Sequence, residues 1–479
     1  MRLRQMMGRP SLSTEAFGAL ILSGGDERLT VNSAGENKYY VNPLQSAGVF
    51  NRGSCTCSPL TPDGERAARS LLNRLAAREV KFGAARQSQR QRIIELYDPD
   101  GTHDMNVIFA PSGSDLCYLP LLFSSAIRPG TPVHNIVVCC EELGSGSLLA
   151  HQGKYFSRQS QIARHLTTGE AVSQKLEIVY HPFSARDEAA AILDHSRTIK
   201  QLIQDHSAHS AVIVNLVIGS KSGIENSLSI IEECQEYDVV WTVDLCQMRS
   251  APALVGHLLD LNCLLFITGS KFYQAPPFCG AILVPGRRMR DLAEAASPDI
   301  AGFNRLFSRC DFPDDLDSLR ARFPAYQNRG LLLRWEAALA EMELFDHLPS
   351  DKTTAAIETW NRTVLDALDR SRVLEPLRDQ EQTNRSIVSF RIRHGHRFLS
   401  HEELQILHRQ VAGTGHQTLS RHRKVLIGQP VSYGAGSFLR LAIGAHDVRQ
   451  LVTGSTDFDD DLALIRLIEN MTSQVVRAR

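Results

Sequence analysis

Lys271 stands at a point where a lysine side chain can do chemistry. It follows Thr268, Gly269 and Ser270, and this short polar stretch ends the apolar run 264–267. An amine that is partly desolvated in such a place can attack a carbonyl group and form a Schiff base. The alternative is a solvent-exposed loop lysine, which is the usual situation for a lysine taken at random. The other residues near Lys271 in the sequence pattern therefore show whether a Schiff-base lysine or an exposed loop lysine is the better interpretation.

Asp244 is the second residue of this kind, and it ends the apolar run 239–243. A carboxylate that binds a pyridine nitrogen keeps it protonated, so that the ring accepts electrons from a substrate carbanion. Gln247 follows three residues later and could face the hydroxyl of such a ring or a phosphate. Together, Lys271 and Asp244 indicate pyridoxal 5'-phosphate (PLP) as the cofactor. An aspartate that only caps a turn is the alternative, and it is common at strand ends.

Two stretches of small and hydroxyl residues are candidates for a phosphate site. Ser112, Gly113 and Ser114 stand between a predicted strand, 106–110, and a predicted helix. Small residues let backbone N–H groups and hydroxyls approach a phosphate, and a helix N-terminus favours negative charge. An ordinary helix cap uses the same residue types. The second stretch contains Thr268 and Ser270, next to Lys271.

The elements that must position these residues alternate between apolar strands and helices from about residue 90 to 285. Near-continuous apolar strands with helical crossovers predict a mainly parallel sheet that is covered on both faces. Ligands of such a sheet bind at the carboxyl ends of its strands, where the residues above are expected to meet. The predicted strands are 106–110, 135–139, 175–180, 211–215, 239–243, 264–267 and 280–284, and the predicted helices are 114–128, 186–205 and 224–237.

The 479 residues are expected to form three parts. They are an N-terminal arm and helix (1–84), a large α/β domain (85–325) and a smaller α+β C-terminal domain (326–479). Helical spacing of apolar residues predicts a helix over 61–84 and a long helical region over 327–372. In the last part, strands are predicted at 386–392 and 438–443, and helices at 401–411 and 460–471.

The composition excludes some classes of partner. Lys and Arg number 52 against 53 Asp and Glu, so no electrostatic reason favours nucleic acid or an anionic membrane. No apolar run approaches the roughly 20 residues that span a bilayer. The ten cysteines lack paired C-x-x-C spacing, so neither a metal site nor a disulfide framework is predicted. A cytoplasmic location is expected, although Arg2, Arg4 and Arg9 leave an organellar presequence open.

Four motifs between 106 and 285 resemble the large domain of fold-type I PLP enzymes. Within that class they resemble the class V aminotransferase group, which includes cysteine desulfurases and kynureninases. The implied architecture is the PLP-dependent transferase fold of type I. The matching stretches are 214–219 (V-N-L-V-I-G, against V-N-N-E-I-G), 243–247 (V-D-L-C-Q, against V-D-A-x-Q), 269–274 (G-S-K-F-Y-Q, against G-H-K-x-Y-G) and 280–284 (G-A-I-L-V, against G-x-L-Y-V).

The resemblance implies roles for individual residues. Lys271 would be the Schiff-base lysine, Asp244 the partner of the pyridinium nitrogen, and Gln247 a contact of the ring oxygen. Arg440 matches a small-domain arginine that binds the substrate carboxylate, a task that suits a planar guanidinium; an exposed strand arginine is the alternative. The residues implied to contact the phosphate are Ser112, Gly113, Ser114, Thr268 and Ser270.

Three departures from the group's pattern are visible. The group often stacks a histidine on the cofactor ring, but residues 140–147 contain none, so Glu142 or a backbone-lined loop could take that place. The second asparagine of V-N-N is Leu216 here. No cysteine follows Cys310, which argues against the persulfide chemistry of cysteine desulfurases and places the chain outside the known ones.

The sequence therefore predicts a PLP-dependent enzyme that acts on a small amino acid, with Lys271 as base or acid at the substrate α-carbon. Transamination is favoured, and a lyase reaction (β-elimination or C–S/C–C cleavage) is the alternative. A non-catalytic scaffold is less favoured. The resemblance also implies a homodimer, in which residues 35–57 could form a lid over the pocket. The identity of the substrate does not follow from the sequence.

Overall fold

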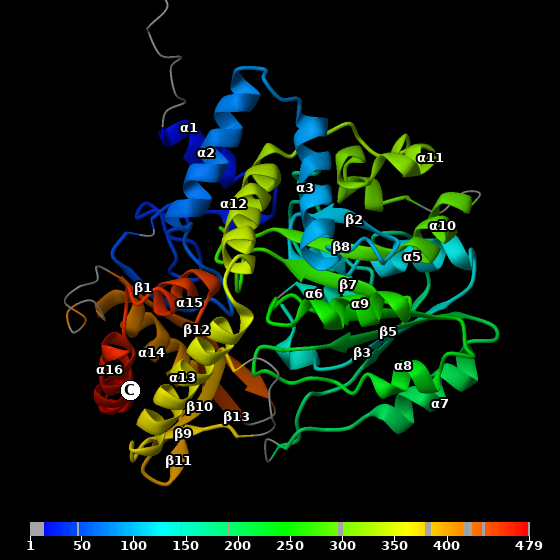
Figure 1. Ribbon diagram of the computed structural model, residues 1–479. Helices are drawn as coiled ribbons and strands as arrows, with labels where there is room; N and C mark the ends of the chain where they lie inside the picture. Colours follow the sequence, from blue (N-terminus) through cyan, green and yellow to red (C-terminus); the bar gives the residue numbers. More distant parts are fainter. Residues whose placement is uncertain are drawn as a thin grey trace, which may run out of the picture.

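The computed structural model describes residues 14–45, 47–144, 146–188, 191–295, 300–378, 385–414, 417, 419, 424–433 and 436–477. Figure 1 shows two β-sheets in separate halves of the molecule, with the long helix α12 (Arg329–Asp346) between them. In these residues no helix combines the length and the apolar character that a bilayer crossing would need.

The larger sheet has seven strands in the order β2-β8-β7-β6-β5-β3-β4. Neighbouring strands are parallel except at β8, which runs antiparallel to β2 and β7. The prediction of a mainly parallel sheet is thus confirmed, and the strand expected at 175–180 lies slightly later. The strands are β2 (Met105–Ala110), β3 (Val133–Val137), β4 (Ile178–Pro182), β5 (Ala211–Val217), β6 (Val239–Asp244), β7 (Leu264–Thr268) and β8 (Gly280–Pro285).

The helices of this half are shorter than the sequence predicts. The helix expected over 186–205 begins only at Ser196, and Arg186 instead forms a β-bridge with Ile192. The helix expected over 224–237 is reduced to five residues, because Glu225 forms a β-bridge with Ile218. The helices are α4 (Gly113–Leu116), α5 (Leu119–Ile127), α6 (Ser147–His151), α7 (Ser196–His206), α8 (Ser229–Glu233), α9 (Pro252–Asp260), α10 (Gly286–Glu294) and α11 (Asp317–Arg320).

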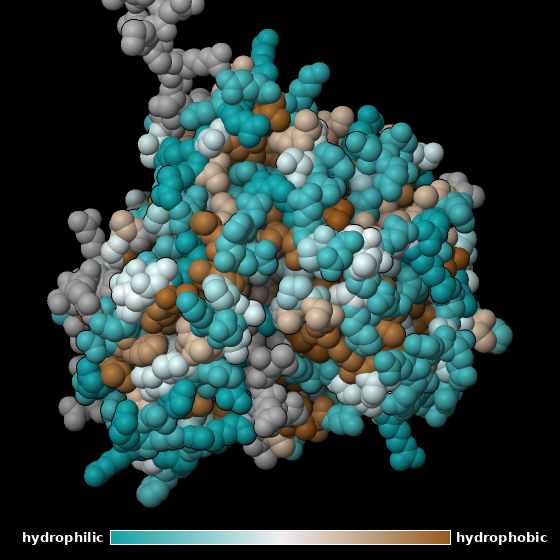
Figure 2. All heavy atoms as spheres, viewed as in Figure 1, coloured by the Kyte–Doolittle hydropathy of each residue, from teal (hydrophilic) through white to brown (hydrophobic). Residues whose placement is uncertain are grey.

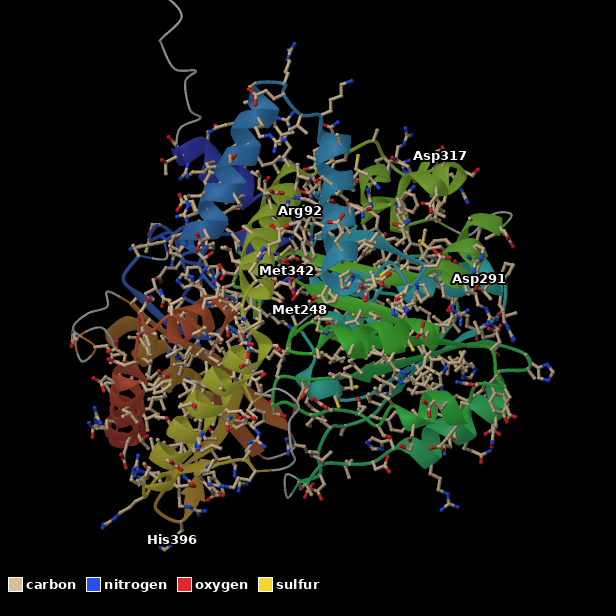
Figure 3. The ribbon with its side chains drawn as sticks, viewed as in Figure 1. Arg92, Met248, Asp291, Asp317, Met342 and His396 are labelled. Atoms are coloured by element: carbon tan, nitrogen blue, oxygen red, sulfur yellow. The ribbon has the colours of Figure 1, made fainter. Side chains whose placement is uncertain are left out.

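The N-terminal part contains two long helices rather than one. The predicted helix 61–84 ends at Ala76 because Arg78 adopts a left-handed conformation (φ 58°) and Glu79 N–H bonds back to Arg74 O. A second helix then extends into the region where strands were expected, and its Arg92 (labelled in Figure 3) pairs with acids of α12. The elements are α1 (Thr14–Ile21), β1 (Val49–Arg52), α2 (Pro62–Ala76) and α3 (Phe82–Tyr97).

The smaller sheet combines the C-terminal part with one N-terminal strand. Its order is β1-β12-β13-β10-β11, with β9 also on β10, and β1 runs parallel to β12. The helical region expected over 327–372 is two helices, separated around Pro349. The elements are α12, α13 (Ser350–Asp369), β9 (Leu374–Pro376), β10 (Ile387–His394), β11 (Arg397–Phe398), α14 (His401–Thr414), β12 (Lys424–Tyr433), β13 (Gly436–Ala442), α15 (Ala445–Val452) and α16 (Asp459–Arg477). The part boundaries at 84 and 325 stay predictions.

The two halves meet along a seam. In Figure 2 the visible face is mostly hydrophilic, with hydrophobic residues in small groups over both halves. Met248, after β6, and Met342, on α12, lie close together there in Figure 3. Both line a cavity of about 330 Å³, together with Tyr97, Tyr273 and Phe345. The lining is partly apolar and aromatic, but it also contains charged and hydroxyl residues such as Arg249 and Asp346.

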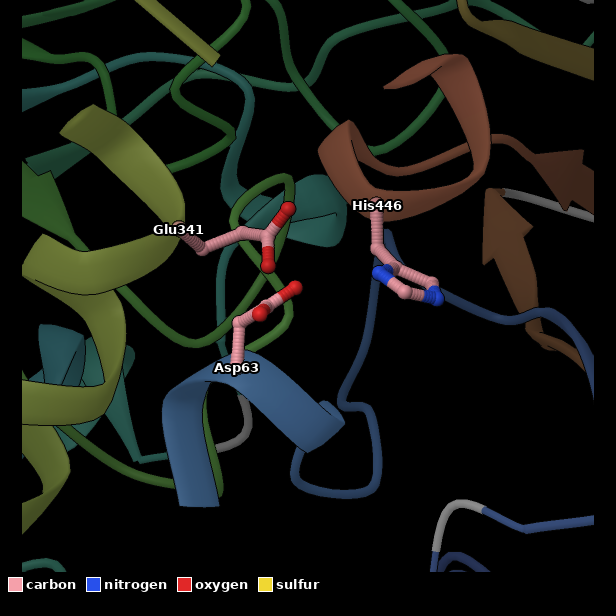
Figure 4. A group of neighbouring side chains, drawn as sticks. All are labelled: Asp63, Glu341 and His446. Atoms are coloured by element: carbon pink, nitrogen blue, oxygen red, sulfur yellow. The ribbon is translucent and has the colours of Figure 1, made fainter. Parts of the chain in front are cut away.

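A polar cluster ties α2, α12 and α15 together. The side chains of Asp63, Glu341 and His446 converge, as Figure 4 shows, and their potential ligand atoms lie within 4.8 Å of one another. The guanidinium of Arg449 binds both carboxylates, with Nε 2.6 Å from Glu341 and Nη2 2.7 Å from Asp63. Arg66 also pairs with Asp63, so two arginines balance the two carboxylates and the cluster is a structural ion-pair network in the described residues.

A buried ion pair fixes β1 against the C-terminal helices. Arg52 Nε and Nη2 donate to the two carboxylate oxygens of Asp461 at 2.6 and 2.8 Å. Trp360 Nε1 donates to the same carboxylate at 2.9 Å, and Asp461 is fully buried. Because a buried charge is costly without its partner, Arg52 and Asp461 hold the N-terminal segment in one place.

Replacing Asp461 tests this anchor. Asp461→Asn leaves the buried Arg52 guanidinium with only Asp447, 3.4 Å from its Nη1, as a counter-charge, so the free energy of unfolding is expected to fall by about 3 kcal/mol. Urea unfolding followed by circular dichroism measures the change. Asp459→Asn, at the exposed start of the same helix, is the control and should cost less than about 1 kcal/mol. Equal losses in both variants would contradict the anchoring role.

Candidate active site

One pocket lies at the carboxyl ends of β6 and β7. Asp244 ends β6, Thr268 ends β7, and Lys271 follows in the next turn. Since β6 and β7 are neighbouring parallel strands, their carboxyl ends meet at one edge of the sheet. The pocket is lined by most of the predicted site residues, namely Gly113, Ser114, Asp244, Thr268, Ser270, Lys271 and Arg440.

The loop that carries Lys271 is held against α12. A Cβ at Gly269 would come within 2.3 Å of the Ala338 Cβ, so only glycine allows this close approach. The turn then closes with a hydrogen bond from Gln274 N–H to Lys271 O at 3.0 Å. The Lys271 side chain is half-buried and reaches the pocket. The neighbouring Asp244 is also half-buried, and its carboxylate accepts from Cys246 N–H at 2.8 Å.

An arginine that the sequence did not connect with the site, Arg28, contacts the predicted phosphate loop. Arg28 Nη1 donates to Ser114 Oγ at 3.1 Å, and Arg28 Nη2 donates to Ser112 Oγ at 2.8 Å. Ser112 does not line the pocket, and its hydroxyl donates to Asp115 Oδ2 at 2.6 Å. Ser112 therefore supports Arg28 rather than facing the pocket, whereas Gly113 and Ser114 lie at the pocket wall.

Arg28 is held by charge and by two aromatic rings. Its guanidinium pairs with Asp26, with Nη2 2.6 Å from Oδ2, and it lies 4.9 Å from the Phe156 ring centre and 4.6 Å from that of Phe278. Burial opposes ionisation of Asp26, but the Arg28 guanidinium lowers the pKa of that carboxyl overall. No motif in residues 26–28 signals this role, because the two serines that Arg28 contacts lie more than 80 residues away in sequence.

Thr268 and Gln247, which were expected to contact the cofactor, each donate a hydrogen bond to a backbone carbonyl instead. Thr268 Oγ1 donates to Cys246 O at 2.7 Å, so its hydroxyl proton is directed at the backbone. Gln247 is buried outside the pocket lining, and its Nε2 donates to Cys55 O at 3.1 Å. In the described residues Gln247 Oε1 has no hydrogen-bond partner. Ser270 is buried at the pocket wall beside the Cys279 thiol.

Arg440 lies inside the pocket and is not an exposed strand residue, since it is 1% exposed. Its Nε and Nη2 donate to Gln429 O at 3.1 and 2.8 Å, and Nη2 also donates to Thr56 Oγ1 at 3.2 Å. In the parts of the chain that the structure describes, no carboxylate pairs with it. Its charge is therefore satisfied only by neutral oxygen atoms.

The loop after β3 does not bring Glu142 to the pocket. The Glu142 carboxylate is buried and accepts hydrogen bonds from Ser222 N–H at 2.8 Å and from Ser222 Oγ at 2.5 Å. Gly144 and Ser147 of the same loop line the pocket instead. The sequence left two replacements open for the histidine that often stacks on the cofactor ring, Glu142 or a backbone-lined loop. The loop lies at the pocket wall, and Glu142 does not. Leu216 is buried in the core.

The segment 35–57 contributes Tyr39, Cys55 and Thr56 to the pocket wall. Ser54 Oγ accepts from Arg249 Nη2 at 3.0 Å, which ties the segment to the loop after β6. Cys55 is a thiol at the pocket wall. The argument against persulfide chemistry was that the C-terminal part has no cysteine, and it did not consider a cysteine from the N-terminal segment. A cysteine from the N-terminal segment reaches the pocket all the same. The role of 35–57 as a lid stays a prediction.

Asp115 is a buried acid next to the predicted phosphate loop, 112–114. Burial and the neighbouring Asp26 raise the pKa of Asp115 to about 7, although Arg28 opposes this. A carboxyl with a raised pKa favours folding when it is protonated, and that contribution is lost as the pH rises through the folded-state pKa. A neutral Asp115 also avoids repulsion of an anion bound near Ser114.

Asp115→Asn tests this assignment. Between pH 4 and pH 8 the wild type should lose stability relative to Asp115→Asn, by about 4 kcal/mol at most, since each pKa unit corresponds to about 1.4 kcal/mol. Urea unfolding of both proteins across that range measures the difference. A difference that stays constant with pH would show that Asp115 is ionised throughout.

Comparison with known proteins identifies the fold. No family model and no curated protein matches the chain. Among solved structures, the cysteine desulfurase CsdA from Escherichia coli has a TM-score of 0.56 at 13% identity, covering 90% of this chain and 95% of that one. The NifS-like protein from Rickettsia africae has 0.55 at 10% (88% and 99%). The ureidoglycine-glyoxylate aminotransferase from Bacillus subtilis has 0.53 at 13% (91% and 99%).

The chain has the PLP-dependent transferase fold of type I. This confirms the fold class that the motifs predicted, including the large, mainly parallel sheet and the second α+β part. At identities of 10–13% the likeness defines the fold, whereas the reaction depends on the residues in the pocket.

Proposed function

We propose that the chain is a PLP-dependent enzyme of the class V aminotransferase type that acts on a small amino acid by transamination. The observation that carries this proposal is that Lys271 and Asp244 line the same pocket as the Arg28–Ser114 pair. An amine, a carboxylate and an anion-binding loop are the three groups that PLP requires. The solved structures of similar fold include aminotransferases by name.

The residues present fit PLP. Arg28 and Ser114 offer a cation and a hydroxyl beside the backbone N–H groups of a helix start, which suits a phosphate. A Cβ at Gly113 would come within 3.2 Å of Thr268 Cγ2, so glycine keeps this wall open. Gln247 lies outside the pocket lining, so its contact with the ring oxygen stays a prediction.

Each residue then has a defined task. When bound, PLP supplies an aldehyde for the substrate amine and a ring that accepts electrons. Asp244 holds the proton on the ring nitrogen, and Lys271 Nζ moves a proton at the substrate α-carbon. Arg440 orients the substrate α-carboxylate with its planar guanidinium. The roles of Ser270 and Thr268 are to contact the phosphate, Thr268 after its hydroxyl leaves the Cys246 carbonyl.

Two alternatives use the same pocket. A lyase reaction would require the same amine and carboxylate, and the choice depends on which substrate bond the pocket holds perpendicular to the ring. A non-catalytic scaffold is less favoured, because a pocket with several cations is costly to maintain without an anionic ligand. A homodimer and a cytoplasmic location remain predictions.

Trapping the cofactor on its lysine tests the proposal. Purified protein incubated with PLP and then reduced with borohydride should carry one label on the peptide that contains Lys271, as read by mass spectrometry. Lys271→Ala should lose the label and the activity. Lys221→Met is the matched control, since Lys221 is the other lysine at the pocket wall, and it should keep the label. A label on Lys221, or none at all, would refute the proposal.

A second test concerns Arg28. Arg28→Met should weaken PLP binding by about 10- to 100-fold, because hydrogen bonds to a charged group contribute about 1.5–3 kcal/mol. Binding of pyridoxal, which lacks the phosphate, should change little. Asp26→Asn keeps the guanidinium and is the control for the disrupted ion pair. An equal loss for PLP and pyridoxal would place Arg28 outside the phosphate site.

A further inference from the structure

The pocket holds more positive charge than the cofactor accounts for. Its wall carries four basic side chains, Arg28, Lys221, Lys271 and Arg440, and one acid, Asp244. Under the proposed function, Arg28 faces the phosphate while Lys271 and Asp244 serve the aldehyde and the ring nitrogen. Lys221 and Arg440 remain. Two cations with no anionic partner in a partly desolvated pocket indicate a ligand that brings two negative charges.

Lys221 and Arg440 lie next to each other. Arg440 Nη1 is 3.5 Å from Lys221 O, and Lys221 Nζ donates to Leu143 O. Among the described residues, no carboxylate is within ion-pair distance of the Lys221 amine. The acid on the adjacent loop, Glu142, is occupied by the two Ser222 donors, and it lies 3.6 Å from Arg186 Nε. Lys221 is therefore available to a ligand.

The surroundings of Lys221 disfavour its charge. Burial lowers its pKa, and the neighbouring cations Arg440 and Lys271 lower it further, to about 7, against a smaller opposite effect of Glu142 and Cys55. An anion bound beside the amine would offset both the burial and the repulsion. The sequence gives no hint of this, because Lys221 stands in an ordinary turn after β5 and its neighbours come from distant segments.

We propose that Lys221 binds a negatively charged side-chain group of the substrate, while Arg440 binds the α-carboxylate. The substrate class is then an amino dicarboxylic acid. This rests on the proposed function and specifies its substrate. A compact ammonium with rotatable donors suits a side-chain carboxylate, and the planar guanidinium suits the α-carboxylate, whose position the reaction has to define.

Ligands without an amine test the proposal separately from the chemistry. Calorimetry of the PLP-loaded protein with succinate and with propionate measures binding of two carboxylates against one. Wild type should bind succinate on the order of 10- to 100-fold more tightly than propionate. In Lys221→Met this preference should disappear while propionate affinity stays within about threefold. Lys221→Arg, which keeps the charge, should restore most of it, and Lys175→Met, on the exposed surface, should behave as wild type.

A measurement on the wild type makes the test independent of any variant. Near pH 8, succinate should bind with uptake of a proton, because the bound carboxylate raises the pKa of Lys221, whereas propionate should not. Calorimetry in buffers of different ionisation enthalpy reads this uptake. Tight succinate binding by Lys221→Met, or equal binding of both ligands by wild type, overturns the proposal. Succinate and propionate have no amine and do not react with the PLP aldehyde, so their binding tests only the substrate class. Absence of borohydride labelling at Lys271 would instead refute the proposed function.

Discussion

The buried ion pair between Arg52 and Asp461 is the constraint from which the geometry of the pocket follows. Arg52 ends β1, and Asp461 lies in α16, more than 400 residues later. Because a buried charge is costly without a partner, this ion pair helps to fix the position of β1, which pairs with β12 at the edge of the smaller sheet. Cys55 and Thr56 then follow directly at the pocket wall, where Thr56 accepts a hydrogen bond from Arg440.

The N-terminal segment reaches the pocket at two points. Arg28 binds the hydroxyls of the loop after β2, on the side of the larger sheet, whereas Thr56 contacts Arg440 on the side of the smaller sheet. The segment thus connects the two halves through the pocket itself. A ligand that binds Arg28 and Arg440 together would contact groups from two distant parts of the chain, and its binding would stabilise their arrangement.

Electrostatics explains why the pocket suits anionic ligands. Arg52 has a buried acid as partner, but Lys221 and Arg440 bond only to neutral oxygen atoms in the described residues. A cation at a pocket wall that has no acidic partner favours binding of an anion. Asp115, with its pKa raised to about 7, lies next to the predicted phosphate loop and can be neutral there.

The sequence by itself determined the central features of the fold and of the candidate site. Most strands of the larger sheet are apolar runs, and this signal is local, so the strands could be predicted together with Asp244 and Lys271 at or after the strand ends, but not the order of the strands in the sheet. Helix lengths near 186–205 and 224–237 could not, because β-bridges compete with helix formation there. Only the tertiary structure placed β1, Arg28 and Lys221. Their positions depend on burying charged and polar groups against partners far away in sequence, and no local pattern of residues contains that information.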